Sequence, residues 1–156
     1  MNATILIVED DIDIMRILTY ALSGAGFRVV TAYGGEDAIR KVKAHMPDLV
    51  LTDLSMPKVS GVEVIEAIKS DPATQHIPVI AVTAHVWDSI AQAAGQVGCD
   101  GYISKPFTTK QIIQEVYRHL QPPDAVREIA RRLEDAGFPT YAVGGAVRDA
   151  VLGLRA

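Results

Sequence analysis

The chain has 156 residues and a formal net charge of −4, and 49% of its residues are hydrophobic while 22% are charged. These proportions are those of a soluble, folded protein, and they exclude a disordered chain, a collagen-like repeat and a coiled coil. The acidic balance argues against a dedicated nucleic-acid binder, since neutralising phosphates requires a basic face.

A single cysteine, Cys99, excludes an intramolecular disulfide and a metal site built from several cysteines. No apolar run reaches the roughly 18 residues of a membrane-spanning helix, and the N-terminus lacks the basic and apolar regions of a signal peptide. We therefore expect a cytoplasmic protein that makes no contact with a membrane.

Short apolar runs recur along residues 1–120, and a helical pattern follows each of them. The runs lie at residues 5–8, 28–32, 49–52, 79–82 and 102–104. Several are almost continuously apolar, which is typical of parallel strands covered on both faces. Because parallel neighbours need right-handed crossover helices, the pattern predicts an α/β fold with a doubly wound, five-stranded parallel sheet.

The first and last helices of this pattern have clear apolar faces. The first should stop near Gly24 and Gly26, and its apolar positions are Ile14, Leu18, Ala21, Leu22 and Ala25. The apolar positions of the last are Ile113, Val116, Tyr117 and Leu120. Pro122 and Pro123 cannot continue that helix, so a boundary is expected after residue 121.

Residues 122–156 should form a linker and a short helical and β appendage to the domain at residues 1–121. Helical spacing is seen at Val126, Ile129, Ala130 and Leu133. Residues 140–143 suit a strand, and Gly144 and Gly145 suit a turn into a last helix.

Carboxylates follow two of the predicted strands. Glu9 and Asp10 come after the first strand and Asp53 after the third. In the common doubly wound order these strands are neighbours, so the three acids should converge where such sheets bind ligands. Their repulsion calls for a hard cation, and a few carboxylates in a wet pocket suit Mg²⁺ better than Ca²⁺. Asp11 and Asp13 are expected to be solvated or helix-capping residues.

Thr83 and Lys105 follow the fourth and fifth strands and should point into the same pocket. A hydroxyl, an ammonium and a divalent cation around one carboxylate suit a phosphoryl group. Asp53 would then be the nucleophile. An acyl phosphate on it would add charge that Thr83 and Lys105 detect by moving toward it.

Together these segments resemble the receiver domain of two-component response regulators. The resemblance covers roughly residues 3–120, and its landmarks are residues 5–10, residues 53–57 with Gly61, residues 82–84 and residues 105–107. It implies a flavodoxin-like fold in which Asp53 takes a phosphoryl group from a histidine kinase or a histidine phosphotransfer protein. It also implies a signalling domain that acts on an unknown downstream protein and is not an enzyme beyond its own phosphorylation and dephosphorylation.

The same resemblance assigns roles to single residues. It implies that Mg²⁺ is held by Glu9, Asp10, Asp53 and the backbone carbonyl of Ser55. It further implies that Thr83 and Lys105 contact the phosphoryl group, that Tyr102 is the switch aromatic, and that the Lys105–Pro106 bond is cis.

Ser55 and His85 stand two residues after Asp53 and two residues after Thr83, where water approaches an acyl phosphate in such domains. We expect both to tune the lifetime of the phosphorylated state. For His85 two interpretations remain open, a general base or an exposed loop histidine.

Residues 124–154 resemble the opening of the head domain of tRNA nucleotidyltransferases and bacterial poly(A) polymerases. In that family paired glycines approach a nucleotide and two metal-binding aspartates follow, but this chain ends at Ala156 before them. Without those aspartates we expect no polymerisation. A tight turn also explains Gly144 and Gly145, and a truncated fusion, a gene fragment and a designed junction all remain open.

Two further functions compete with the receiver interpretation. One is a regulatory receiver fused to a nucleotidyltransferase-type enzyme that is incomplete here. The other is a phosphohydrolase of the haloacid dehalogenase type, which Ser55 disfavours because that family needs a second aspartate at this position. A DNA-reading output is not expected, since the tail lacks a helix-turn-helix pair with a basic recognition helix.

Overall fold

Five parallel strands form one sheet in the order β2-β1-β3-β4-β5 in the computed structural model, which describes residues 3–84, 88–120, 132 and 135–137. The strands are β1 (Thr4–Val8), β2 (Arg28–Ala32), β3 (Leu49–Asp53), β4 (Val79–Thr83) and β5 (Gly101–Ser104). The helices are α1 (Ile12–Gly24), α2 (Gly35–His45), α3 (Gly61–Ser70), α4 (Ser89–Gln96) and α5 (Thr109–His119).

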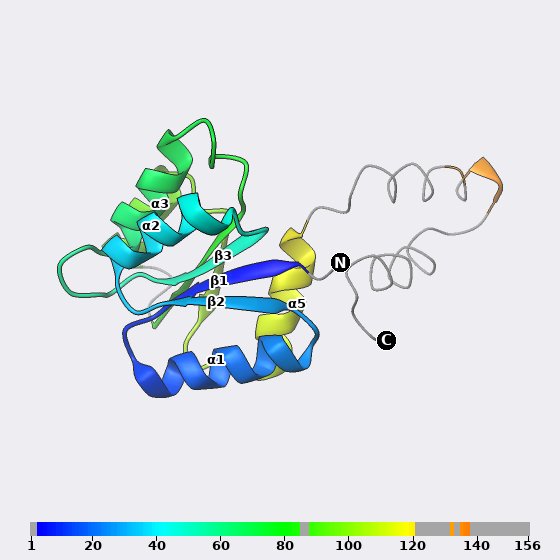
Figure 1. Ribbon diagram of the computed structural model, residues 1–156, viewed down its shortest axis with the longest axis horizontal. Coiled ribbons are helices and arrows are strands. Elements are labelled where there is room, and N and C mark those ends of the chain that lie inside the picture. The colour runs from blue at the N-terminus through cyan, green and yellow to red at the C-terminus, as the bar shows by residue number, and fades with distance from the viewer. Residues whose placement is uncertain (1–2, 85–87, 121–131, 133–134, 138–156) are drawn as a thin grey trace.

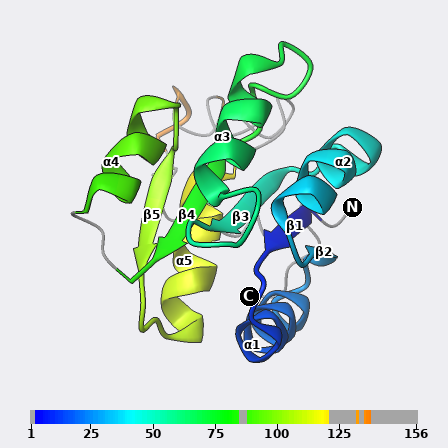
Figure 2. The same ribbon diagram turned by 90° about the vertical axis from the view of Figure 1, so that its left-hand side faces the viewer.

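The helices cover the sheet in two layers. Helices α1 and α5 lie on one face, and α2, α3 and α4 lie on the other (Figures 1 and 2). Each face has its own apolar cluster, and every residue of β3 and β4 is buried. Burial on both faces explains why these strand sequences are apolar throughout instead of alternating. The predicted doubly wound, flavodoxin-like sheet is confirmed.

The helix starts follow from local capping residues. Asp11 caps α1 by accepting hydrogen bonds from the N–H groups of Asp13 and Ile14, as expected for this aspartate. Ser60 and Glu63 form a reciprocal capping box at α3. Thr108 starts α5 with the same arrangement.

The apolar face of α5 differs from the prediction by a small rotation. Ile112, Val116 and Leu120 are fully buried, whereas Ile113 and Tyr117 are half-buried at the edge of the cluster. The ring of Tyr117 packs there on Phe27, with 5.5 Å between ring centroids. The apolar pattern alone does not distinguish the centre of a helix face from an edge that another aromatic ring covers.

The predicted elements of residues 122–131 and 138–156 lie outside the described residues. Across the described part of the chain, no helix has the length and apolar character needed to cross a membrane.

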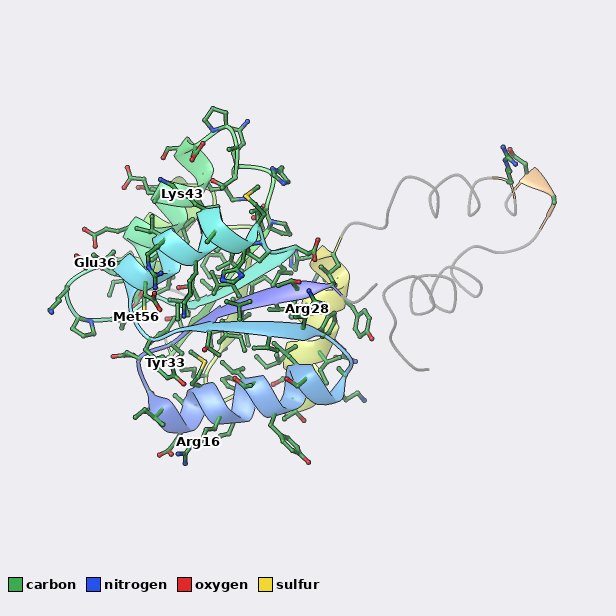
Figure 3. All side chains as sticks on the ribbon, in the orientation of Figure 1. Arg16, Arg28, Tyr33, Glu36, Lys43 and Met56 are labelled. Carbon is green, nitrogen blue, oxygen red and sulfur yellow. The ribbon has the colours of Figure 1, made fainter. Side chains whose placement is uncertain are left out.

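The strand ends and the loops after them form one edge of the sheet. Figure 3 shows Tyr33, after β2, and Met56, after β3, at this edge, while Arg28 marks the start of β2 at the opposite edge. Gly61 lets α3 begin directly against this edge of the sheet. The N–H of Gly61 donates to the Leu54 carbonyl at 3.1 Å. A Cβ atom at residue 61 would lie 2.0 Å from the carbonyl oxygen of Asp53. Since that neighbour is backbone, the position requires glycine.

We predict that Gly61→Ala lowers the free energy of unfolding by about 1–3 kcal/mol, because the added methyl group displaces the backbone of Asp53. The matched control is Gly24→Ala, whose added Cβ meets no described atom within 4 Å outside its own helix and chain neighbours. Urea unfolding of both variants measures the effect. If Gly61→Ala were as stable as Gly24→Ala, the backbone of Asp53 would accommodate the added methyl group without loss of free energy of unfolding.

Candidate functional site

Three carboxylates meet where β1 and β3 end. The two strands are hydrogen-bonded neighbours, with Val8 opposite Thr52. One oxygen from each of Glu9, Asp10 and Asp53 lies within 4.8 Å of the others. Glu9 and Asp53 are buried, and Asp10 is exposed. The structure therefore brings together the acids that the sequence placed at separate strand ends.

Lys105 reaches this cluster from the loop after β5. Its Nζ lies 3.4 Å from Asp53 Oδ1 and 3.5 Å from Glu9 Oε2. The backbone N–H of Lys105 donates to the carbonyl of Thr83 at 2.8 Å, which fixes the loop against the end of β4. The Lys105–Pro106 bond is cis, as the resemblance implies.

Thr83 is the last residue of β4, and its side chain is buried. In the ladder between β3 and β4, Asp53 lies opposite Val82, so Thr83 stands at the same edge one residue further on. Thr83 itself lies opposite Ser104, the residue before Lys105. A hydroxyl, an ammonium and three carboxylates thus come from four different strand ends.

Burial raises the pKa of Glu9 from 4.5 to about 7, and the negative charge of Asp53 acts in the same direction. The backbone N–H of Asp11, which donates to Glu9 at 3.1 Å, and the Lys105 ammonium oppose this rise in pKa. Sequence reasoning did not find the contribution of Asp11, because a backbone N–H leaves no signal in the sequence. Burial and the charge of Asp53 thus outweigh the combined effect of the Asp11 N–H and the Lys105 ammonium on the pKa of Glu9.

The donor set suits a hard divalent cation. The cluster offers carboxylate oxygens from three residues, two of which are buried. Carboxylate oxygens are ligands that Mg²⁺ takes in proteins. Across the described residues this is the single group of three or more His, Cys, Asp or Glu side chains close enough to hold a metal ion. The observed arrangement therefore fits a magnesium ion.

The remaining predicted residues lie around this cluster. Ser55 is exposed, and its backbone N–H donates to Asp53 Oδ1 at 3.4 Å. Tyr102 lies on β5, half-buried, with its hydroxyl donating to the carbonyl of Ala91 in α4 at 2.8 Å. His85 lies outside the described residues.

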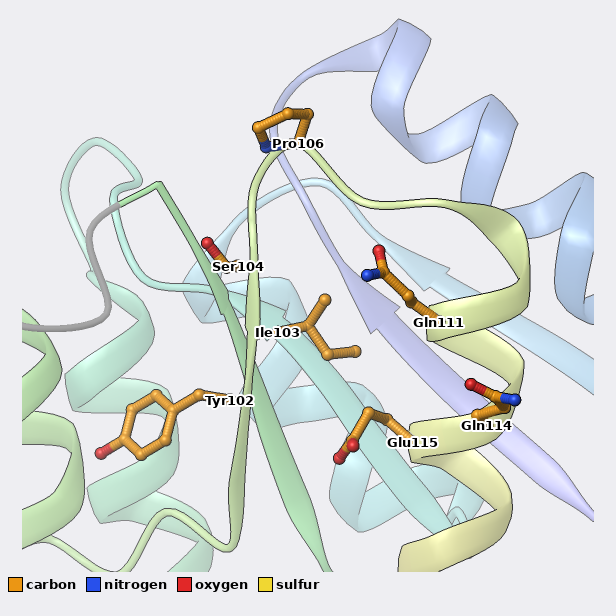
Figure 4. Close-up of a pocket in the computed structure, with 7 residues that line it drawn as sticks. All are labelled: Tyr102, Ile103, Ser104, Pro106, Gln111, Gln114 and Glu115. Carbon is orange, nitrogen blue, oxygen red and sulfur yellow. The ribbon is translucent and has the colours of Figure 1, made fainter.

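A shallow pocket of about 230 Å³ opens beside Tyr102, between β5 and α5 (Figure 4). Its wall is formed by Tyr102, Ile103, Ser104, Pro106, Gln111, Gln114 and Glu115. The pocket is separate from the acid cluster, because no carboxylate of that cluster lines it.

Comparison with known proteins gives matches to the same part of the chain. The family described as response regulator receiver domain matches residues 5–117. The polar-differentiation response regulator DivK of Brucella ovis is 35% identical over 120 residues, which cover 77% of this chain and 98% of that protein. DivK of Brucella anthropi is also 35% identical over 120 residues.

Solved structures are similar over the same region. The chemotaxis protein CheY4 of Vibrio cholerae superposes with a TM-score of 0.73 at 28% identity, covering 77% of this chain and all of that chain (100%). The receiver domain of the sensor histidine kinase PA1611 of Pseudomonas aeruginosa gives a TM-score of 0.71 at 25% identity, covering 76% and 97%. That structure has a magnesium ion coordinated in its active-site cleft.

The raised pKa of Glu9 predicts a pH dependence of stability without metal. Between pH 4.5 and about 7 the folded protein keeps a proton on Glu9 that the unfolded chain has lost, so stability falls as pH rises through this window. We expect a fall on the order of 1–3 kcal/mol between pH 5 and pH 8.

Urea unfolding in EDTA, with Glu9→Gln as the comparison, measures this contribution. Glutamine does not titrate, so the variant should lose this part of the fall while the histidines act equally in both proteins. Parallel pH profiles for the two proteins would contradict the assignment of the raised pKa to Glu9.

Proposed function

The chain belongs to the receiver domain family of two-component response regulators, and we propose that phosphorylation of Asp53 switches it. One observation carries this proposal. Asp53 is buried at the end of β3, beside two other carboxylates and with the Lys105 ammonium 3.4 Å from its Oδ1. A carboxylate held in this way is positioned as a nucleophile next to a group that stabilises phosphoryl oxygens.

In the proposed reaction an Asp53 oxygen attacks the phosphorus of a phosphohistidine on a histidine kinase or a histidine phosphotransfer protein. The P–O bond to Asp53 forms as the P–N bond breaks, and the imidazole leaves. Lys105 then contacts the transferred group, and Thr83 contacts it from the end of β4. Positioning and charge stabilisation supply most of the catalysis in such transfers.

We propose that Glu9, Asp10, Asp53 and the backbone carbonyl of Ser55 hold Mg²⁺. The proximity of the three carboxylates and the magnesium ion in the PA1611 receiver support this ligand set. When bound, the ion neutralises negative charge on the phosphoryl oxygens. The chain's own acids would otherwise repel an anionic donor.

Phosphorylation is proposed to act through Thr83 and Tyr102. Ser55 and His85 are proposed to tune the lifetime of the phosphorylated state. A phosphoryl group on Asp53 draws the Thr83 hydroxyl and the Lys105 ammonium toward it, since it adds charge and acceptor oxygens at one point. Tyr102 then changes its packing between discrete arrangements. Ser55 stands at the approach to Asp53, with its N–H already directed at Oδ1.

The domain boundaries, cellular location and partners of this switch are also proposals. We assign residues 1–121 to the receiver and residues 122–156 to an appendage, which is supported by a family match that ends at residue 117 and by α5, which ends at His119. The receiver acts in the cytoplasm on a downstream protein, without DNA or membrane contacts. The nucleotidyltransferase resemblance falls mostly on residues outside the described ones and stays a prediction.

We predict that Asp53→Asn removes phosphoryl uptake, because an amide oxygen is a far weaker nucleophile in the same shape. Intact-mass analysis after incubation with acetyl phosphate and Mg²⁺ should find one added phosphoryl group on the native chain and none on the variant. The control is Asp48→Asn, which alters the aspartate just before β3, at the opposite end of the strand from Asp53, and should label normally. Full labelling of Asp53→Asn would refute the proposed acceptor.

We also predict that labelling depends on a divalent cation through Glu9 and Asp10. Excess EDTA, or the double variant Glu9→Gln/Asp10→Asn at limiting Mg²⁺, should slow labelling by more than about tenfold, the lower range of losses seen when even outer groups of metal sites are changed. Asp13→Asn, in the first turn of α1, is the matched control. A labelling rate unchanged both by EDTA and by the double substitution would mean that these acids do not form the metal site.

A further inference from the structure

Helix α4 has little apolar packing of its own. Its buried residues are Ala91 and Ala94, whose side chains are single methyl groups. On the side facing α3, a groove of about 480 Å³ is lined from α4 by Ser89, Ile90 and Ala93. Among the described residues, the buried side chains of α4 therefore offer little apolar area, and α4 depends on side chains that neighbouring elements extend toward it.

Tyr102 supplies such a contact from β5. Its hydroxyl donates to the carbonyl of Ala91 at 2.8 Å. Its ring packs at the margin of the apolar cluster that also includes Val97 and Cys99. The ring extends from β5 on the side away from α5 (Figure 4). The phenol thus spans the space between β5 and the backbone of α4.

Gly95 leaves the space that the phenol occupies. A Cβ atom at residue 95 would lie 2.8 Å from the hydroxyl oxygen of Tyr102. Apart from α4 itself, the described residues place no other heavy atom within 4 Å of that position. Gly95 is the second-last residue of α4, and it has no positive φ that would require glycine. Glycine is less favourable than alanine in a helix. Contact with Tyr102 is the feature of its surroundings that accounts for glycine here.

We propose that Gly95 is a positioning residue for Tyr102: because it lacks a side chain, the phenol stays hydrogen-bonded to α4 and joins α4 to β5. The inference rests on the proposed function for the role of Tyr102 in the switch. Strand β5 ends at Ser104, opposite Thr83, and Lys105 follows it. A shift of β5 at the acid cluster therefore reaches α4 through Tyr102.

A side chain at residue 95 would occupy the space of the Tyr102 hydroxyl. Rotation about the Cα–Cβ bond of Tyr102 then moves the phenol away from α4. Ring and helix then lose their hydrogen bond, and α4 loses this one link to β5. The consequence of Gly95→Ala is a displaced Tyr102, with α4 still helical.

A double-mutant cycle in the full chain tests the contact. In a Tyr102→Phe background the hydroxyl is gone, so Gly95→Ala should act only as a better helix former and raise the melting temperature by about 2–6 °C. With Tyr102 present the same substitution should give a smaller rise or a fall. Equal shifts in both backgrounds would overturn the proposal. Gly24→Ala, another glycine in a helix, is the control and should shift both backgrounds equally.

A spectroscopic measurement separates positioning from general stability. With tyrosine labelled at Cζ with ¹³C, the ring signal of Tyr102 is the one that Tyr102→Phe removes. Gly95→Ala should move this signal toward that of solvent-exposed tyrosines, and an unmoved signal would overturn the proposal. Labelling by acetyl phosphate is a separate readout, because its failure in the native chain would refute the proposed function while the cycle still decides the role of Gly95.

Discussion

Mutual repulsion among Glu9, Asp10 and Asp53 is the constraint around which the rest of this structure is arranged. The parallel sheet brings these acids within 4.8 Å because β1 and β3 are neighbours and end at the same edge. Burial makes the charge of Glu9 costly, and the nearby charge of Asp53 adds to this, so the pKa of Glu9 rises to about 7. Lys105, the N–H of Asp11 and a fitting divalent cation are all responses to this one electrostatic problem.

The fold supplies these responses from elements that are otherwise ordinary. Asp11 caps α1 with its side chain while its N–H supports Glu9, so one residue serves both the helix and the site. Gly61 allows α3 to start against the backbone of Asp53. The loop after β5 is tied to Thr83 by the N–H of Lys105. The geometry of the site therefore depends on helix starts and strand ends and much less on long flexible loops.

The strands and the acid cluster were predictable from sequence because each follows from a local pattern combined with one topological rule. Continuous apolar runs predicted β3 and β4, and neighbouring strand ends predicted the meeting of Asp53 with Glu9. The contact of Tyr102 with Ala91 was not predictable, because it depends on how far α4 stands from the sheet. Gly95 gave a weak signal, a glycine inside a helix, whose meaning appears only when its three-dimensional neighbour is known. The position of Ile112, and not Ile113, at the centre of the α5 face was likewise not predictable, because it depends on which neighbours cover the helix.

The ion pairs of Lys105 join residues that are 96 and 52 positions apart in the chain. Contacts of such long range are entropically costly, since a large loop has to be closed to form them. During synthesis all three acids leave the ribosome well before Lys105 does. A nascent or shortened chain that stops before residue 105 thus contains the acids without the lysine. The arrangement of acids and lysine is therefore complete only when β5 has paired with β4 and brought Lys105 to the ends of β1 and β3.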